Sequence, residues 1–389
     1  MSESVSVQIE SSAVGDNQAK ADVNADKGEL RVLVAASGTG GHLIPALHIM
    51  RALETAMPGA VIECIGAGKP LEEKLIVGNG YRRHIISTAG VKKRGILGLI
   101  QFLFKLPIGI VQCFKLMLSF KPDVVVGVGG YVSVLPVVVA RFMWIPTWTH
   151  EAELKPGLAN KVLGYFADRM SVSFAETKLR GRVKTVFTGH PVRPELASVD
   201  RSSTPAGSPT KLLILGGSQG ARGLDQVIPE IADLLRDKGV EVVHQCRPEN
   251  CELVVNSYRA ARIKASIVPF IDDMAGAYQW SDLIISRAGA SSVAEIGCVN
   301  RPTIFVPYPF QQGTHQTDNA KALASSNKAL IVEETQPEFG RRLREALTKL
   351  LDRDGYLAMK SAPYEPFGLR AAEQIAAGIV GIAKPKAAL

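Results

Sequence analysis

The residues of this sequence best suited to chemistry lie in a short loop, SGTGGH, at positions 37–42. An apolar run precedes the loop and a helix-like stretch follows it, so the glycines would let the backbone approach a ligand closely. The unpaired N–H groups at the start of that helix would attract negative charge. His42 titrates near neutral pH and is therefore a candidate general base. Taken alone, such a loop could also be a tight turn without a ligand.

Two further loops repeat this arrangement, GVGG at 127–130 and GGSQGA at 216–221. GGSQGA lacks the Lys-Ser/Thr pair of a P-loop, so backbone N–H groups and Ser218 would hold a phosphate. SGTGGH does not match G-x-G-x-x-G, and no acidic residue for a ribose follows the next apolar run. These departures argue against a nicotinamide-dependent dehydrogenase. Three loops of one kind favour ligand binding over simple turns.

Two segments of the second half carry polar groups suited to a nucleotide sugar. Residues 286–296 (SRAGASSVAEI) place small residues and two hydroxyls at the start of a helix, where phosphate binds well. Glu295 could accept both hydroxyls of a ribose, or it could simply balance the helix dipole. Further on, Gln316 and Asn319 share one helical face, and their amides suit sugar hydroxyls. A solvated helix start is the alternative there.

The elements that must position these residues follow from an alternation of apolar runs and helix-like segments. Fully apolar short runs predict parallel strands covered on both faces, at 31–36, 60–66, 123–128, 145–149 and 184–188, and at 211–217, 241–246, 265–270, 282–286, 302–306 and 329–332. A chain of 389 residues favours two domains. We therefore predict an α/β fold of two Rossmann-like, doubly wound parallel-sheet domains with the ligand in an interdomain cleft.

The predicted boundaries follow from changes in composition. The polar start lacks the apolar segment of a signal peptide, and the Pro- and Ser-rich stretch before 211 has no periodicity. We predict a disordered tail at 1–28, a first domain at 29–190, a linker at 191–210, a second domain at 211–368 and a C-terminal helix at 369–389 that packs back toward the first domain.

Charge and cysteine content narrow the class of ligand. Lys and Arg number 45 against 37 Asp and Glu, a net charge of +8 that favours an anionic ligand or an anionic membrane surface. Basic runs interleaved with aromatics do not occur, which argues against nucleic acid. The five cysteines are scattered and lack zinc-site spacing, so reduced thiols are expected and no metal site is predicted.

Residues 96–120 are long enough to span a bilayer, but Lys105, Pro107 and Lys115 interrupt them. A charge at the bilayer centre costs about 3 kcal/mol, so we predict two apolar helical pieces and no span. Burial in the core is one interpretation of these pieces. The other is a membrane-surface patch, made of Lys92, Lys93, Arg94, Leu97, Ile100 and Phe104.

Taken together, the motifs resemble the MurG family of glycosyltransferases. They occur in order between about residues 31 and 380, and they are TGGH, GGYVS, HEAELKPGLAN, GHPVR, GGSQGA, FIDDM, RAGASSVAE and HQTDNA. The resemblance implies a GT-B fold and an inverting transfer of GlcNAc from UDP-GlcNAc to the MurNAc-pentapeptide of undecaprenyl-pyrophosphoryl lipid I. The product would be lipid II for peptidoglycan synthesis, with consequences for cell wall biogenesis, cell shape and division. No cofactor or metal is implied.

The resemblance also assigns roles to residues and domains. His42 would assist the attacking hydroxyl, and the first domain would take the acceptor and the membrane. The residues expected to bind UDP-GlcNAc are Thr39, Gly40 and Gly41 (sugar and diphosphate), Arg193 and Ser218 (diphosphate), Ile271 (uracil, through its backbone), Ala290, Ser291, Ser292, Val293, Ala294 and Glu295 (phosphate and ribose) and Gln316 (GlcNAc hydroxyls).

The implied location is the cytoplasmic face of the cell inner membrane, bound peripherally. The implied partners are UDP-GlcNAc, lipid I, the anionic membrane surface and other cell-wall and division proteins. Two alternatives stay open. One is a GT-B glycosyltransferase or an epimerase that acts on a different acceptor. The other is a non-catalytic protein that binds a nucleotide sugar and recruits cell-wall enzymes to the membrane.

Three motifs depart from the family pattern. Ala152 and Glu153 stand where the family usually has Gln-Asn, and that asparagine contacts the donor sugar. A carboxylate there would repel a diphosphate unless it points away. His190 stands in GHPVR where GNPVR is commoner, and residues after Ser133 are bulkier than usual, which would narrow an acceptor groove.

Overall fold

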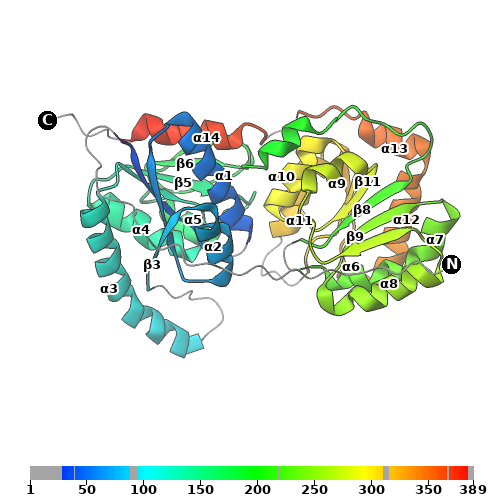
Figure 1. The fold of residues 1–389 in the computed structure, drawn as a ribbon, viewed down its shortest axis with the longest axis horizontal. Helices are drawn as coiled ribbons and strands as arrows, with labels where there is room; N and C mark the ends of the chain where they lie inside the picture. The colour runs from blue at the N-terminus through cyan, green and yellow to red at the C-terminus, as the bar shows by residue number, and fades with distance from the viewer. Residues whose placement is uncertain are drawn as a thin grey trace.

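The computed structural model describes residues 29–38, 40–87, 95–217, 220–309, 315–365 and 368–383, with the side chains of 95–105 excepted. The chain forms two lobes that lie side by side, each built on its own parallel sheet (Figure 1). The predicted pair of doubly wound parallel-sheet domains, the GT-B arrangement, is thereby confirmed. The predicted tail at 1–28 lies outside the described residues.

The first sheet has seven strands in the order β3-β2-β1-β4-β5-β6-β7, all parallel. Their bounds are β1 (Arg31–Ala35), β2 (Val61–Gly66), β3 (Arg82–Ile85), β4 (Val124–Gly127), β5 (Thr147–Glu151), β6 (Arg169–Val172) and β7 (Lys184–Phe187). The helices of this domain are α1 (Gly40–Ala56), α2 (Pro70–Leu75), α3 (Gly95–Phe120), α4 (Gly130–Phe142) and α5 (Leu158–Leu163). The strand order reverses between β1 and β4, where ligands of such sheets bind.

The second sheet has six parallel strands in the order β10-β9-β8-β11-β12-β13. Their bounds are β8 (Lys211–Leu215), β9 (Glu241–Gln245), β10 (Ala265–Val268), β11 (Leu283–Ser286), β12 (Thr303–Phe305) and β13 (Ala329–Ile331). The helices are α6 (Arg222–Val227), α7 (Ala232–Asp237), α8 (Cys251–Ala260), α9 (Met274–Trp280), α10 (Ala290–Val299), α11 (His315–Ala324), α12 (Phe339–Leu351) and α13 (Arg353–Lys360).

Each sheet is covered on both faces, which explains why its inner strands read as continuous apolar runs. Val124, Val125 and Val126 of β4, for example, are all fully buried although their side chains alternate between faces. One apolar cluster of the first domain includes residues of the last helix, α14 (Ala371–Ile382). This helix lies over the first domain beside α1, so the end of the chain crosses back from the second lobe (Figure 1).

The prediction of two helical pieces at 96–120 is wrong, because α3 is one continuous helix with Pro107 inside it. Proline removes only one N–H donor from the hydrogen bonds of the helix, and the leucines in the surrounding sequence favour a helix. Cys113, Met117 and Phe120 bury one face of α3 in the domain core. None of the described helices is long and apolar enough to cross a membrane.

Candidate functional site

His42 lies where the first two glycine loops meet. Its ring packs against the turn before α4, where a Cβ atom at Gly129 would come within 2.9 Å of Nδ1. At Gly130 a Cβ atom would lie 3.5 Å from Cδ2. Both glycines have positive φ, +74° and +75°, so a side chain there would be strained as well as crowded. Ser37, His42, Gly129 and Gly130 therefore meet around the imidazole, at the point where the strand order reverses.

The charge environment keeps His42 neutral. Burial lowers the pKa of its imidazole, and the nearby ammonium of Lys69 lowers that pKa further. Lys69 projects from the start of α2, and its Nζ lies 5.7 Å from the centre of the Tyr131 ring on α4. A neutral imidazole is the form that can accept a proton, so this environment suits a general base.

A buried carboxylate, not predicted from the sequence, holds the loop before His42. Glu72 of α2 is fully buried and accepts a hydrogen bond from Ser37 Oγ at 2.5 Å. The same carboxylate accepts the backbone N–H groups of Ala67, Gly68 and Lys69 at 3.0, 2.9 and 3.2 Å. The loop after β2 and the loop after β1 are thus fixed to each other. An acidic residue at the third position of a helix was the available signal.

The loop after β5 is organised by Glu151. Its carboxylate accepts the N–H groups of Glu153 and Gly157, each at 2.9 Å, and the side-chain amide of Asn160 at 3.0 Å. Burial raises the pKa of Glu151 to about 7, against the effect of these hydrogen bonds. The loop 152–157 therefore has a fixed shape and presents its residues to the second domain.

Glu153, the unusual residue of this loop, points at α11 of the second domain. Its carboxylate accepts a hydrogen bond from the side-chain amide of Asn319. Asn319 Oδ1 in turn accepts the N–H of Leu154 at 3.0 Å, and Lys155 Nζ pairs with Asp318 at 2.7 Å. Burial raises the pKa of Glu153, and the bond from Asn319 opposes the rise. In this chain the position joins the two domains.

The helix α10 also begins at the boundary between the two domains. Ser291 Oγ, in its first turn, lies 2.8 Å from Nε2 of His190, a buried residue of the first domain. Burial holds the pKa of His190 well below its ordinary value, and the nearby rings of His150, His48 and His42 lower it further. Since α1, whose first turn holds His42, contacts α10, the His42 loops and α10 lie on the same domain boundary.

Glu295 and Arg193, predicted to bind ribose and diphosphate, contact each other. Arg193 Nε donates to Glu295 Oε1 at 2.9 Å, and Tyr278 Oη donates to Glu295 Oε2 at 3.1 Å. Burial raises the pKa of Glu295, while Arg193 and Tyr278 oppose this. Arg193 is bound through Nε, which leaves its terminal nitrogens on a partly exposed side chain available for an anion.

Gln316 and Asn319 share a face of α11 and both contact the loop before α10. Gln316 Oε1 accepts the N–H groups of Ala288 and Tyr308 at 3.2 and 2.8 Å. Asn319 Nδ2 donates to the carbonyl of Ala288 at 3.3 Å. Since its carbonyl oxygen is occupied by the backbone, Gln316 has its amide N–H groups to offer to a ligand.

The other residues predicted to bind UDP-GlcNAc or the membrane differ in where they lie. Gly40 and Gly41 begin α1 beside His42, and Ile271 lies in the loop between β10 and α9. The side chains of Val293 and Ala294 are fully buried in the core, so only backbone groups of these residues could face a ligand. Thr39 and Ser218, like Lys92, Lys93 and Arg94, lie outside the described residues, as do the side chains of Leu97, Ile100 and Phe104.

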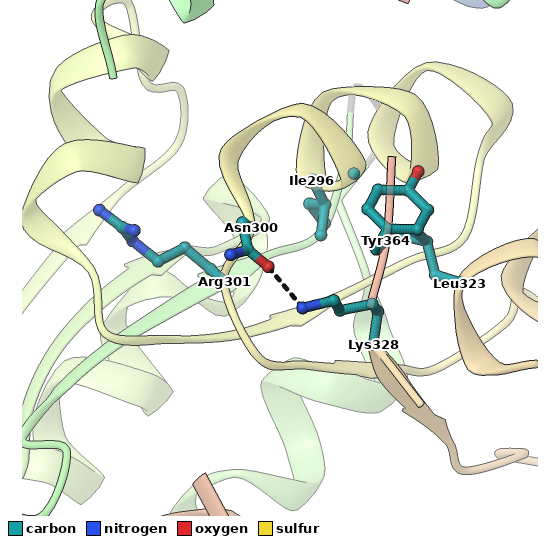
Figure 2. Close-up of a pocket in the computed structure, with 7 residues that line it drawn as sticks. Ile296, Asn300, Arg301, Leu323, Lys328 and Tyr364 are labelled. Carbon is teal, nitrogen blue, oxygen red and sulfur yellow. Dashed lines mark hydrogen bonds between the residues drawn. The ribbon is translucent and has the colours of Figure 1, made fainter. Parts of the chain in front are cut away.

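Among the described residues, two cavities lie away from this domain boundary. One, of about 10 Å³, lies behind α10 next to Lys328, whose Nζ donates to Asn300 Oδ1 at 2.9 Å (Figure 2). It is large enough only for a water molecule. The other, of about 370 Å³, is a surface hollow beside α5, lined by Lys161, Tyr165, Lys178, Leu179 and Arg180.

Comparisons with known proteins agree with this architecture. Residues 32–172 match the glycosyltransferase family 28 N-terminal domain, and residues 211–375 match the family 28 C-terminal domain. A Syntrophus aciditrophicus protein is 37% identical over 308 residues, 78% of this chain and 85% of that protein. A Geobacter sulfurreducens protein is 33% identical over 353 residues, 89% of this chain and 97% of that protein. Both are named UDP-N-acetylglucosamine–N-acetylmuramyl-(pentapeptide) pyrophosphoryl-undecaprenol N-acetylglucosamine transferase.

Solved structures give the same result. The crystal structure of Acinetobacter baumannii MurG covers 90% of this chain and 99% of its own, with a TM-score of 0.73 and 29% identity. A UDP-GlcNAc 2-epimerase from Neisseria meningitidis covers 90% of this chain at a TM-score of 0.62, but its 13% identity indicates a shared fold only. On the family 28 domains and the relatives that cover most of its length, this chain belongs to the MurG family of glycosyltransferases.

Proposed function

We propose that this glycosyltransferase moves GlcNAc from UDP-GlcNAc to the MurNAc-pentapeptide of undecaprenyl-pyrophosphoryl lipid I, which makes lipid II for peptidoglycan. The observation that carries the proposal is that α1, whose first turn holds His42, contacts α10, whose own first turn is tied to the first domain by the His190–Ser291 hydrogen bond. A transferase needs a base and a nucleotide site that face each other across one cleft. The relatives named for this reaction support the choice of substrates.

In the proposed mechanism, neutral His42 takes the proton of the acceptor hydroxyl while the hydroxyl oxygen bonds to the anomeric carbon of GlcNAc. The bond between that carbon and the diphosphate oxygen breaks with inversion, and UDP leaves. The terminal nitrogens of Arg193 and the first N–H groups of α10 stabilise the charge that develops on the diphosphate. His42 then passes its proton to solvent. No cofactor or metal takes part in these steps.

The remaining donor contacts follow the family assignment. Glu295 accepts the ribose hydroxyls with the lone pairs that Arg193 and Tyr278 leave open, and the peptide groups of Ile271 bind the uracil. Gln316 donates its amide N–H groups to the GlcNAc hydroxyls. Thr39, Gly40, Gly41 and Ser218 border the diphosphate. Glu153 contributes to closure of the domains and makes no contact with the sugar.

The proposed location is the cytoplasmic face of the membrane, bound peripherally. Three neighbouring helices of the first domain, α3, α4 and α5, support it. They and the short turns after α4 and α5 expose a set of large apolar side chains, which we call the apolar face: Ile108, Ile110, Val111, Phe114, Leu118, Phe142, Trp144, Leu158, Val162 and Tyr165. The hollow with Lys161, Lys178 and Arg180 adjoins α5, so cations lie beside the apolar surface. Such a combination favours an anionic lipid surface.

The test is an assay of the purified chain with UDP-GlcNAc and a lipid I analogue, which should yield the lipid II analogue and UDP in equal amounts. His42→Gln should lower kcat by roughly 10²- to 10⁴-fold and leave UDP-GlcNAc binding intact, because only proton transfer is removed. The exposed Lys184→Gln serves as a control with normal activity. Release of UDP without a glycosylated lipid, or 2-epimerisation of UDP-GlcNAc, would contradict the proposal. Binding without any turnover would favour a recruiting protein instead.

A further inference from the structure

A chain of hydrogen bonds runs through the buried seam between the domains and ends on the first turn of α10. Ser171 Oγ, on β6, lies 3.0 Å from His150 Nδ1. His150 Nε2 lies 3.3 Å from His190 Nδ1, and Ser173 Oγ bridges these two nitrogens at 3.3 and 3.1 Å. His190 Nε2 then lies 2.8 Å from Ser291 Oγ. The four residues of the first domain are buried, so solvent does not compete for these bonds.

Ser171, the first residue in this series of hydrogen bonds, determines which nitrogen of His150 carries the proton. Ser171 donates its single hydroxyl proton to the carbonyl of Thr149 at 3.2 Å and accepts the indole N–H of Trp148 at 3.1 Å. It can only accept a further bond, so His150 Nδ1 is the donor. Burial lowers the pKa of His150 to about 3, which leaves the ring neutral. His150 Nε2 therefore presents a lone pair.

The same order of donor and acceptor continues through His190. Burial and the neighbouring His150 hold the pKa of His190 well below its ordinary value, so this ring is neutral too. Because His150 Nε2 is an acceptor, His190 Nδ1 must be the donor at this junction, directly or through Ser173. His190 Nε2 is then the acceptor, and Ser291 donates its hydroxyl proton to it. The hydroxyl of Ser291 is held in one orientation by the first domain.

We propose that His190 is a positioning residue of the donor site: through Ser291 it holds the first turn of α10 in the place where the diphosphate of the nucleotide sugar binds. The inference rests on the proposed function, which assigns the donor to that turn. Asparagine can fill the position of Nδ1, but it is too short to reach Ser291. The tie between the first domain and α10 therefore depends on the length of the His190 side chain.

A matched pair of variants tests the tie. His190→Asn keeps a donor toward His150 and loses the bond to Ser291, whereas the longer amide of His190→Gln reaches the position of Nε2. We expect His190→Asn to raise the Kd and KM for UDP-GlcNAc about tenfold, with kcat within about twofold, because the half-buried hydroxyl of Ser291 loses its partner. His190→Gln should stay within about twofold of the unmodified chain. Calorimetry with UDP-GlcNAc measures Kd, and the transfer assay measures KM and kcat.

A double-mutant cycle separates positioning from packing. Ser291→Ala should raise Kd as His190→Asn does, and the double variant should bind no more weakly than Ser291→Ala alone. His84→Asn, the same change on β3 next to Glu63, should leave Kd unchanged. Additive losses, an equal loss in His190→Asn and His190→Gln, or an unchanged Kd in Ser291→Ala would each overturn the inference. Because Kd is measured without an acceptor, failure of transfer to lipid I would refute the proposed function, and the Kd values of the variants could still be compared.

Discussion

At the scale of single residues, the protonation states of the site are set by burial and by neighbouring charge. His42 has no carboxylate partner among the described residues, so nothing there stabilises its imidazolium form, and Lys69 opposes that form. The site therefore differs from a Ser-His-Asp arrangement, in which a carboxylate supports the imidazolium. Here the proposed base can accept a proton because burial and Lys69 keep its ring neutral.

Removing the Lys69 charge should move the pH profile of the reaction. In Lys69→Met the pKa of His42 rises, because the ammonium that disfavours the protonated ring is gone. A base must be neutral, so the acidic limb of kcat/KM against pH shifts to higher pH, and activity on the acidic side falls more than activity on the alkaline side. Steady-state rates across pH measure this shift.

Lys74→Met is the control for that change. Lys74 lies on the same helix, and its Nζ also lies over an aromatic ring, 5.6 Å from the centre of Phe270. Its charge does not contribute to the lowered pKa of His42. An acidic limb that stays in place in Lys69→Met, or that moves equally in Lys74→Met, would show that Lys69 does not act on the base.

At the scale of elements, the sequence pattern predicted those strands and loops whose structure depends on residues close together in the chain. The apolar runs identified the buried strands, since a strand covered on both faces must be apolar throughout. Two strands were missed: β3 (RRHI) lies at the sheet edge and is only half-buried, and β6 (RMSV) mixes apolar with polar residues. The glycine loops and the start of α10 were found because each is contained in a few consecutive residues.

The contacts that complete the site could not be predicted in this way, because their partners are far apart in the chain. Glu72 and Ser37 are 35 positions apart, His190 and Ser291 are 101 apart, and Glu153 and Asn319 are 166 apart. No periodicity links such pairs, and only the packing of the two domains brings them together. The unusual Glu153 raised a question about repulsion, and the structure answers it with a partner from the other domain.

The last helix provides a test at this scale. Gly378 of α14 packs on Trp148, and a Cβ atom there would lie 2.2 Å from the indole ring. Gly378→Ala should therefore lower the free energy of unfolding by about 1–3 kcal/mol, despite the better helix propensity of alanine. Urea denaturation followed by circular dichroism measures the change.

Gly381→Ala gives the comparison within the same helix, because a Cβ atom at Gly381 meets nothing within 4 Å. This variant should be neutral or slightly more stable. If both variants had the same stability, α14 would not be docked against Trp148, and the return of the chain to the first domain would contribute little.

At the scale of the whole molecule, the two domains carry different surfaces. The segments proposed to bind the nucleotide are in the second domain, while α3, α4 and α5 put the apolar face on the first. The side-chain contacts Glu153–Asn319, Lys155–Asp318 and Arg193–Glu295 cross between the domains or join the linker to α10. An acceptor held in a membrane could thus meet a donor held in the other lobe.

Membrane binding should accordingly depend on the apolar face. Phe114 and Leu118, which are 45% and 53% exposed on α3, are replaced together by serine, and Leu253→Ser on α8 of the second domain, 56% exposed, is the control. Burying each apolar side chain in lipid is worth about 1.5–3 kcal/mol, so the double variant should bind phosphatidylglycerol vesicles at least tenfold more weakly. Leu253→Ser should bind normally, and transfer to a water-soluble acceptor should be unchanged in both. Binding of the unmodified chain should weaken as salt rises, because Lys161, Lys178 and Arg180 adjoin the apolar face. Equal sedimentation of all three proteins with vesicles would mean that another surface meets the membrane.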